Sequence, residues 1–254
     1  MTPAPMRVVA LGASNLTRGL LALTDTSRRT WGGDVEIFAA LGHGRSYGMR
    51  SRFVARDLPG ILDSGLWEAL SGLGPAPTRA LVTDVGNDIL YGASADRVLG
   101  WVEEAVSRLL LRTDDVVIAG LPMDALGHLR TSAFLLVRSV LFPTCRLTLG
   151  EVRSVAEEVS QGLLELAQRR GIRFAPLRAE WYGFDPIHFR PATWDAAWAE
   201  ILDCPVRPAN LPADLREWLT LYGLLAERQW ILGREIRRPQ TGQPLRHGGR
   251  LFLF

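Results

Sequence analysis

The chain contains no lysine, so all 29 of its basic residues are arginine. They are nearly balanced by 27 acidic residues, and the formal net charge at pH 7 is only +2. A charge this small gives no electrostatic support for a general role in binding nucleic acid or a membrane surface. We therefore expect no nucleic-acid partner, and we attribute the arginine bias to genomic codon usage.

Cysteine and long apolar runs are also scarce. Cys145 and Cys204 lack the spacing of metal ligands, and we interpret both as free, at least half-buried thiols. No stretch approaches the roughly 20 apolar residues that span a bilayer. The first residues show no charged region followed by an apolar run, so no signal peptide is predicted. We expect a cytoplasmic protein without a membrane span.

The apolar runs that are present alternate with stretches of helical spacing. Buried parallel strands are predicted at 7–11, 35–41, 80–85, 116–121 and 172–177. Helices are predicted at 17–31, 48–62, 94–112, 149–170 and 192–202. Ser94 would be the N-cap of the third helix, and Gly171 would end the fourth. This alternation predicts a three-layer α/β/α domain of the flavodoxin-like type, built on a five-stranded parallel sheet.

Two segments fall outside this alternation. The strongly apolar segment 122–148 is predicted either to pack as a core helix or to form a wall of the substrate pocket. A proline-rich boundary near residue 205 divides the chain into a domain at 1–204 and an extension at 205–254. The extension is predicted to form an amphipathic helix at 213–228 and a short apolar strand at 248–254. We expect it to pack on the core or on another subunit, and to contribute to oligomerisation.

Candidate site residues follow the predicted strands in four places. They are Ser14 after the first strand, Gly44 after the second, Asn87 after the third, and Asp185 with His188 after the fifth. The carboxyl ends of parallel strands meet at one edge of a sheet, where ligands bind in such folds. Each segment alone has a structural reading, such as an N-cap for Ser14 or a turn for Asn87. Together they supply a nucleophile, a base, an orienting carboxylate and hydrogen-bond donors.

The chemistry of a serine nucleophile needs these residue types. A serine hydroxyl attacks only with a base in hydrogen-bond reach, and the pKa of histidine suits that task. Asp185, three residues before His188, would hold the imidazole in the tautomer that accepts from Ser14. The N–H groups of Ser14 and Gly44 and the Asn87 amide would stabilise a developing oxyanion.

In this order, the segments resemble those of the SGNH hydrolases, also called GDSL esterases and lipases, over roughly residues 7–203. The resemblance implies that Ser14, His188 and Asp185 form a catalytic triad, and that Ser14, Gly44 and Asn87 form the oxyanion hole. It also implies that no metal or organic cofactor is needed. Ala13 departs from the family, which usually has Asp or Asn there, and marks the chain as a divergent member.

The sequence leaves the reaction partly open. The first hypothesis is an ester hydrolase that acts on a small-molecule ester. The second is an acyltransferase that uses the same triad, and the third is a binding protein of the same fold without turnover. No substrate-binding residue is predicted. Asp84 and Asp88 are expected to fix the loop around Asn87, and His43 could line the pocket. His128 and His247 are expected to be surface or structural residues.

Overall fold

A seven-stranded sheet lies at the centre of the protein, for which a computed structural model describes residues 4–32, 34–53, 55–183, 185, 187–204, 215–246 and 248–254. All five predicted strands are present, and they pair in parallel in the order β2-β1-β5-β6-β7. They span Met6–Leu11 (β1), Val35–Ala40 (β2), Thr78–Val82 (β5), Val116–Ala119 (β6) and Arg173–Ala175 (β7). The C-terminal segment enlarges the predicted five-stranded sheet with two further strands, β10 (Gln243–Pro244) and β11 (Arg250–Leu253).

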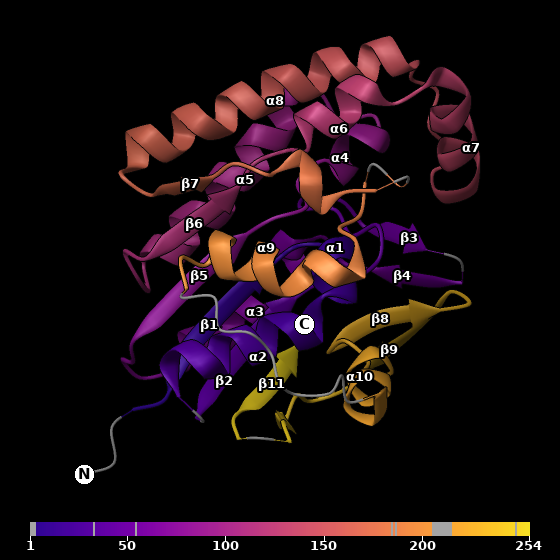
Figure 1. Cartoon of the computed structure of the whole chain (residues 1–254). Coiled ribbons are helices and arrows are strands. Elements are labelled where there is room, and N and C mark those ends of the chain that lie inside the picture. The colour runs from indigo at the N-terminus through magenta and orange to yellow at the C-terminus, as the bar shows by residue number, and fades with distance from the viewer. Residues whose placement is uncertain are drawn as a thin grey trace.

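Alternate side chains of β1 enter two different buried layers, as expected for a strand that is covered on both faces. Val9 and Leu11 lie in a core cluster with residues of α5 and α8, whereas Val8 and Ala10 lie in a cluster with residues of α2 and α9. Figure 1 shows α5 and α8 together on one side of the sheet and α2 and α9 on the other. The predicted three-layer α/β/α architecture is therefore confirmed. These helices span Leu20–Trp31 (α2), Ala95–Leu110 (α5), Leu149–Arg170 (α8) and Trp194–Ile201 (α9).

The ends of α5 and α8 agree closely with the sequence. α8 begins with a capping box, in which Thr148 Oγ1 accepts from the Glu151 N–H and the Glu151 carboxylate accepts from the Thr148 N–H. It ends at Gly171, whose φ of +63° favours glycine. α5 begins directly after Ser94, as predicted, but the Ser94 side chain makes no capping hydrogen bond.

The first predicted helix is divided in two at Gly19. α1 spans Ser14–Arg18, and α2 follows it. A Cβ atom on Gly19 would lie 2.5 Å from Nε1 of Trp198 in α9. The Trp198 indole N–H donates to the Gly19 carbonyl at 3.1 Å. Close packing of α9, which continues from the 3₁₀ turn η3 (Pro191–Thr193), therefore requires glycine at this break.

The helix predicted at 48–62 is wrong, because this segment forms a strand pair. β3 (Ser51–Phe53) pairs with β4 (Arg56–Leu58), and the turn η1 (Ile61–Asp63) and helix α3 (Leu66–Ser71) follow. β4 also pairs with β8 (Arg228–Ile231), which continues to β9 (Arg234–Arg237) in a second, four-stranded sheet. Three apolar residues in this segment have helical spacing. The segment nevertheless forms strands, because β4 pairs with a strand more than 170 residues away in the chain.

The extension joins the core of the same chain over its described residues. Its strand β11 pairs in parallel with β2, and Phe252 stacks on Phe38 with ring centroids 4.5 Å apart. This is the strand predicted at 248–254. The predicted helix at 213–228 is shorter, because α10 spans Leu215–Tyr222, with residues 213–214 outside the described ranges. Figure 1 shows α10, β8 and β9 beside the β3–β4 hairpin.

The segment 122–148 contains two short helices, α6 (Met123–His128) and α7 (Thr131–Leu141). The turn η2 (Ala179–Trp181) and helix α4 (Asn87–Leu90) complete the elements near the carboxyl edge of the sheet. Across the described ranges, no helix combines the length and the apolar character needed to cross a membrane.

Candidate active site

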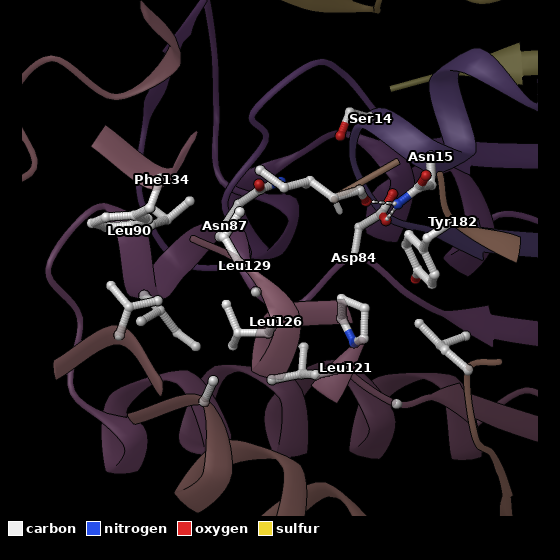
Figure 2. Close-up of a pocket in the computed structure, with 18 of the residues that line it drawn as sticks. Ser14, Asn15, Asp84, Asn87, Leu90, Leu121, Leu126, Leu129, Phe134 and Tyr182 are labelled. Carbon is white, nitrogen blue, oxygen red and sulfur yellow. Dashed lines mark hydrogen bonds between the residues drawn. The ribbon is translucent and has the colours of Figure 1, made fainter. Parts of the chain in front are cut away.

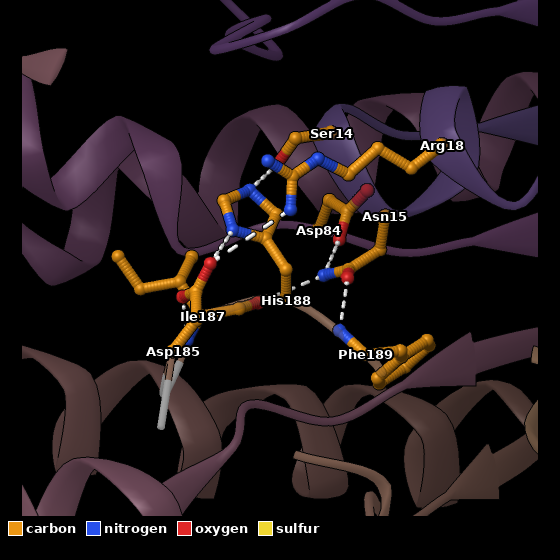
Figure 3. Close-up of polar contacts among 8 residues, drawn as sticks. All are labelled: Ser14, Asn15, Arg18, Asp84, Asp185, Ile187, His188 and Phe189. Carbon is orange, nitrogen blue, oxygen red and sulfur yellow. Dashed lines mark hydrogen bonds and ion pairs between the residues drawn. The ribbon is translucent and has the colours of Figure 1, made fainter. Parts of the chain in front are cut away.

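A chain of hydrogen bonds links Ser14, His188 and Asp185 at the carboxyl edge of the sheet. Ser14 is the first residue of α1, directly beyond β1, and its Oγ lies 2.9 Å from His188 Nε2. His188 Nδ1 lies 2.7 Å from Asp185 Oδ2 (Figure 3). Ser14 and His188 are buried, whereas the Asp185 side chain is half-exposed. The three residues predicted as nucleophile, base and orienting carboxylate are thus in direct contact.

The charge on Asp185 suits the role of an orienting acceptor. Burial acts to raise the pKa of its carboxyl, but the hydrogen bond from His188, the Ile187 N–H and the nearby Arg18 together lower the pKa below its usual value. Arg18 Nη1 lies 3.8 Å from Asp185 Oδ2, and the Ile187 N–H donates to Oδ1 at 3.0 Å. The carboxylate is therefore ionised at neutral pH and accepts the Nδ1–H of His188, which leaves Nε2 free to accept from Ser14. Pro186, between these residues, lies outside the described ranges.

Asn15 ties the nucleophile helix to the histidine loop, a contact that the sequence analysis missed. Its Nδ2 donates to Asp84 Oδ1 at 2.8 Å and to the Ile187 carbonyl at 3.0 Å, and its Oδ1 accepts from the Phe189 N–H at 2.8 Å (Figure 3). The two peptide groups lie on either side of His188 along the chain. Asn15 thereby fixes the backbone that carries the imidazole. The asparagine directly after the predicted nucleophile was the available signal in the sequence.

Asp84 holds the start of α1 from the end of β5. Its Oδ2 accepts from the Ala13 N–H at 2.8 Å and the Leu16 N–H at 3.1 Å, and it has a positive φ of 57°. Such a conformation is strained for a non-glycine residue and is kept only where its contacts fix it. The carboxylate also satisfies helix N–H groups that lack intrahelical acceptors. Asp84 therefore fixes the turn in which Ser14 lies.

Three hydrogen-bond donors around Ser14 have no acceptor among the residues that the structure describes. Within the described ranges, neither the N–H groups of Ser14 and Gly44 nor the Asn87 amide donates a hydrogen bond. All three residues line one cavity of about 160 Å³, together with His188. Gly44 has a φ of +64°, and Tyr91 Oη donates to its carbonyl at 2.7 Å. Free donors that converge beside a nucleophile can hold an oxyanion.

A buried carboxylate joins the Gly44 loop to the Asn87 turn. Asp88 is fully buried and accepts from Ser46 Oγ and, at 3.0 Å, from the Tyr47 N–H. Burial raises the pKa of Asp88 to about 6, although these hydrogen bonds act in the opposite direction. Tyr47 Oη in turn donates to the carbonyls of Leu11 and Thr83 at the ends of β1 and β5. The loops that carry Gly44 and Asn87 are thus fixed to each other and to the sheet.

Solved structures with the same fold could be found, although sequence comparisons found no match. No family model matches the chain, and no curated protein matches it. Among solved structures, a member of the lipolytic protein G-D-S-L family from Veillonella parvula DSM 2008 matches with a TM-score of 0.52. The match has 14% identity and covers 78% of this chain and 97% of that chain. The chain has the SGNH hydrolase fold.

Two further structures match at a TM-score of 0.49. The psychrotrophic esterase EstA from Pseudoalteromonas sp. is 11% identical and covers 84% of this chain and 98% of its own. TesA is 14% identical to this chain, and the match covers 78% of this chain and 96% of TesA. Identity this low concerns the fold alone, so the roles of individual residues in this SGNH fold have to be argued from their geometry.

An apolar pocket of about 110 Å³ opens beside Ser14, between the Asn87 turn and segment 122–148 of the SGNH fold. Figure 2 shows Ser14 and Asn87 at one end of this pocket and leucine and phenylalanine side chains along it. Phe134 is buried in the core and also lines this pocket, so the segment both packs in the core and borders a pocket beside Ser14. The apolar lining residues include Leu90, Leu121, Leu126, Leu129 and Phe134.

The other histidines and the cysteines considered in the sequence analysis lie in different parts of the structure. His43 lines the cavity at Ser14, and its Nε2 lies 3.2 Å from Tyr222 Oη. His128 ends α6 and lines neither cavity, while His247 lies outside the described ranges. Cys145 and Cys204 are free and buried. Over the part of the chain that the structure describes, no three His, Cys, Asp or Glu residues are grouped as metal ligands.

Proposed function

We propose that the protein hydrolyses a carboxylic ester through an acyl-enzyme on Ser14. The observation that carries this proposal is the continuous hydrogen-bond chain from Ser14 Oγ to His188 and on to Asp185, at 2.9 and 2.7 Å. His188 accepts the hydroxyl proton as Oγ attacks the ester carbonyl. Asp185 keeps the imidazole in the required tautomer and stabilises the imidazolium that forms.

The reaction proceeds in two balanced half-reactions, each through its own tetrahedral intermediate. In the first, the bond to the leaving oxygen breaks, His188 transfers its proton to that oxygen, and the acyl group remains on Ser14. In the second, His188 deprotonates a water molecule that attacks the acyl carbon, and the proton returns to Ser14 Oγ as the acid departs. The free donors of Ser14, Gly44 and Asn87 bind the oxyanion in both steps. One such donor lowers the barrier by about 3 kcal/mol.

The apolar pocket beside Ser14 is proposed to hold the acyl group of the ester. It borders Ser14 and Asn87 but not His188, so a carbonyl at Ser14 can place its apolar chain there while the leaving oxygen faces the imidazole. Burial of each CH₂ group contributes roughly 0.8 kcal/mol. An acyl chain of several carbons therefore binds more tightly than acetate in this pocket, and we propose a preference for medium-length acyl esters.

A panel of 4-nitrophenyl esters from acetate to decanoate tests the proposed hydrolysis. We expect turnover by the wild type, with the free acid as product, and loss of at least about 10³-fold in kcat for Ser14→Ala. Ser71→Ala is the matched control, because Ser71 is an exposed residue at the end of α3 that bonds only to the Glu68 carbonyl. Equal turnover by Ser14→Ala and the wild type would overturn the proposal. If the acyl group is transferred to added alcohols and no free acid is released, the protein is an acyltransferase and not a hydrolase.

A further inference from the structure

Two cavities meet at Ser14, and only one of them borders His188. The apolar pocket lacks His188, whereas the cavity of about 160 Å³ is lined by His188, Gly44 and Arg18 among others. In the proposed reaction, the imidazole transfers a proton to the departing oxygen, so that oxygen must lie near His188 Nε2. The leaving part of the ester therefore occupies the cavity on the His188 side, which we name the leaving-group cavity.

A larger cavity of about 320 Å³ adjoins the leaving-group cavity. The two share His43, Phe53 and Tyr222 in their linings. His43 packs on Phe53 with ring centroids 5.0 Å apart and lies 3.2 Å from the Tyr222 hydroxyl, so these three side chains border both spaces. The larger cavity, which we name the junction cavity, lies where α10 and β8 of the extension meet the β3–β4 hairpin (Figure 1).

A half-buried arginine with no counter-ion among the described residues lines the junction cavity. Arg56 comes from β4, and within the described ranges its side chain makes no hydrogen bond or ion pair. Its neighbours on the same hairpin differ, because Arg50 and Arg52 both pair with Asp57. Among the described residues that line the junction and leaving-group cavities, none is Asp or Glu. A half-buried guanidinium without an anionic partner carries a desolvation cost that a bound anion would offset.

The residues between the two cavities also lie in a positive field. Burial, with smaller contributions from the charges of Arg18, Arg56 and His188, lowers the pKa of His43 to about 4. His43 is therefore neutral at pH 7 and serves as a hydrogen-bonding group. Burial also lowers the pKa of Arg56, but a guanidinium remains protonated at neutral pH. A positive field in cavities whose described lining residues include no Asp or Glu favours an anionic ligand group.

We propose that the leaving part of the substrate carries an anionic group, a phosphate or a carboxylate, that binds Arg56 in the junction cavity. This rests on the proposed ester hydrolysis and extends it to a substrate class: an ester with an apolar acyl chain on one side and an anionic leaving group on the other. The planar guanidinium of Arg56 matches the oxygens of either anion in a bidentate contact. His43 and Tyr222 flank the path to it from Ser14.

Matched esters with the same octanoyl group test this assignment. One pair consists of the octanoyl esters of 4-hydroxybutanoate and 4-hydroxybutanamide, and the other of the octanoyl esters of 3-hydroxypropyl phosphate and 1,3-propanediol. We expect the wild type to prefer the anionic member of at least one pair in kcat/KM by about tenfold or more, which corresponds to about 1.4 kcal/mol. The pair with the larger ratio identifies carboxylate or phosphate as the group that binds.

Variants of the hairpin arginines separate this site from general charge effects. Arg56→Gln is expected to remove the preference for the anionic ester, and Arg56→Lys to restore part of it. Arg52→Gln, the control, removes an exposed charge that already pairs with Asp57 and is expected to keep the wild-type ratio. A wild type without anionic preference, or an Arg56→Gln variant with the wild-type ratio, overturns the assignment. Both results leave ester hydrolysis itself intact, whereas failure of all four esters would contradict the proposed function.

Discussion

Replacing Asn15 with alanine should damage catalysis through the loss of its hydrogen bonds, although its side chain also lines the apolar pocket. The change deletes three hydrogen bonds, to Asp84, to the Ile187 carbonyl and from the Phe189 N–H. Asn15 is 5% exposed, so water replaces these partners poorly. The backbone groups on both sides of His188 would lose their link to helix α1, which carries Ser14.

The size of the effect follows from these contacts. A hydrogen bond contributes about 1 kcal/mol net, and one to a charged group about 2 kcal/mol, so Asn15→Ala should lower the free energy of unfolding by about 3–4 kcal/mol. The catalytic cost is separate, because the imidazole would be free to move relative to Ser14 Oγ. A displacement of about 1 Å can lower the rate about 10²-fold. We expect kcat to fall by roughly this factor, with KM changed little.

The assay combines steady-state kinetics on an octanoyl ester with urea unfolding at the same temperature. Leu23→Ala, in the fully buried core of α2, is the matched control. It should cost about 2–5 kcal/mol of stability and leave kcat near the wild-type value where the protein is folded. If Asn15→Ala loses stability but keeps kcat within about threefold of the wild type, Asn15 has a structural role only and the reasoning is refuted.

Three further predictions concern the oxyanion donors, the buried acid and the pocket. Asn87→Ala should lower kcat by about 10²–10³-fold in ester kinetics, and an effect below about tenfold would remove its amide from the oxyanion hole. Since burial raises the pKa of Asp88 from 3.8 to about 6, the folded protein keeps a proton that the unfolded chain loses. The difference in free energy of unfolding between the wild type and Asp88→Asn should therefore change by up to about 3 kcal/mol, against the wild type, as the pH rises from 4 to 7. A difference that is independent of pH in urea unfolding would contradict this. Leu126→Trp should fill the apolar pocket and lower the octanoate-to-acetate ratio of kcat/KM at least about tenfold, and an unchanged ratio would place the acyl chain elsewhere.

The sheet and two of its helices were predictable because their signals are local. Strand β6, Val116–Ala119, is a short apolar run that is buried along its whole length. α8 carries its own start and stop signals, in Thr148 with Glu151 and in Gly171. The site residues could be predicted for a related reason. Polar residues at the carboxyl ends of parallel strands converge by topology, so Ser14 and His188, 174 positions apart, meet at hydrogen-bond distance.

The remaining features depend on partners that are distant in sequence. The segment at 51–58 forms a hairpin because β8 of the extension pairs with it, and β11 reaches the edge of β2 after more than 200 residues. Periodicity within a short window carries no information on such pairings. The roles of Asn15 and Arg56 were missed for the same reason. Asn15 binds backbone groups at 187 and 189, and Arg56 lines a cavity that exists only where the extension packs on the hairpin.

The central claim is that Ser14 Oγ is the nucleophile, activated by His188. Labelling the folded protein with a fluorophosphonate, followed by peptide mass spectrometry, tests it most directly, because the reagent forms a stable bond to an activated serine. We predict one phosphonyl adduct per chain, on Ser14, formed quickly by the wild type and at least about 10³-fold more slowly by His188→Ala. A folded wild-type protein that hydrolyses esters while Ser14 stays unlabelled, or that carries the adduct on another residue, would contradict the account.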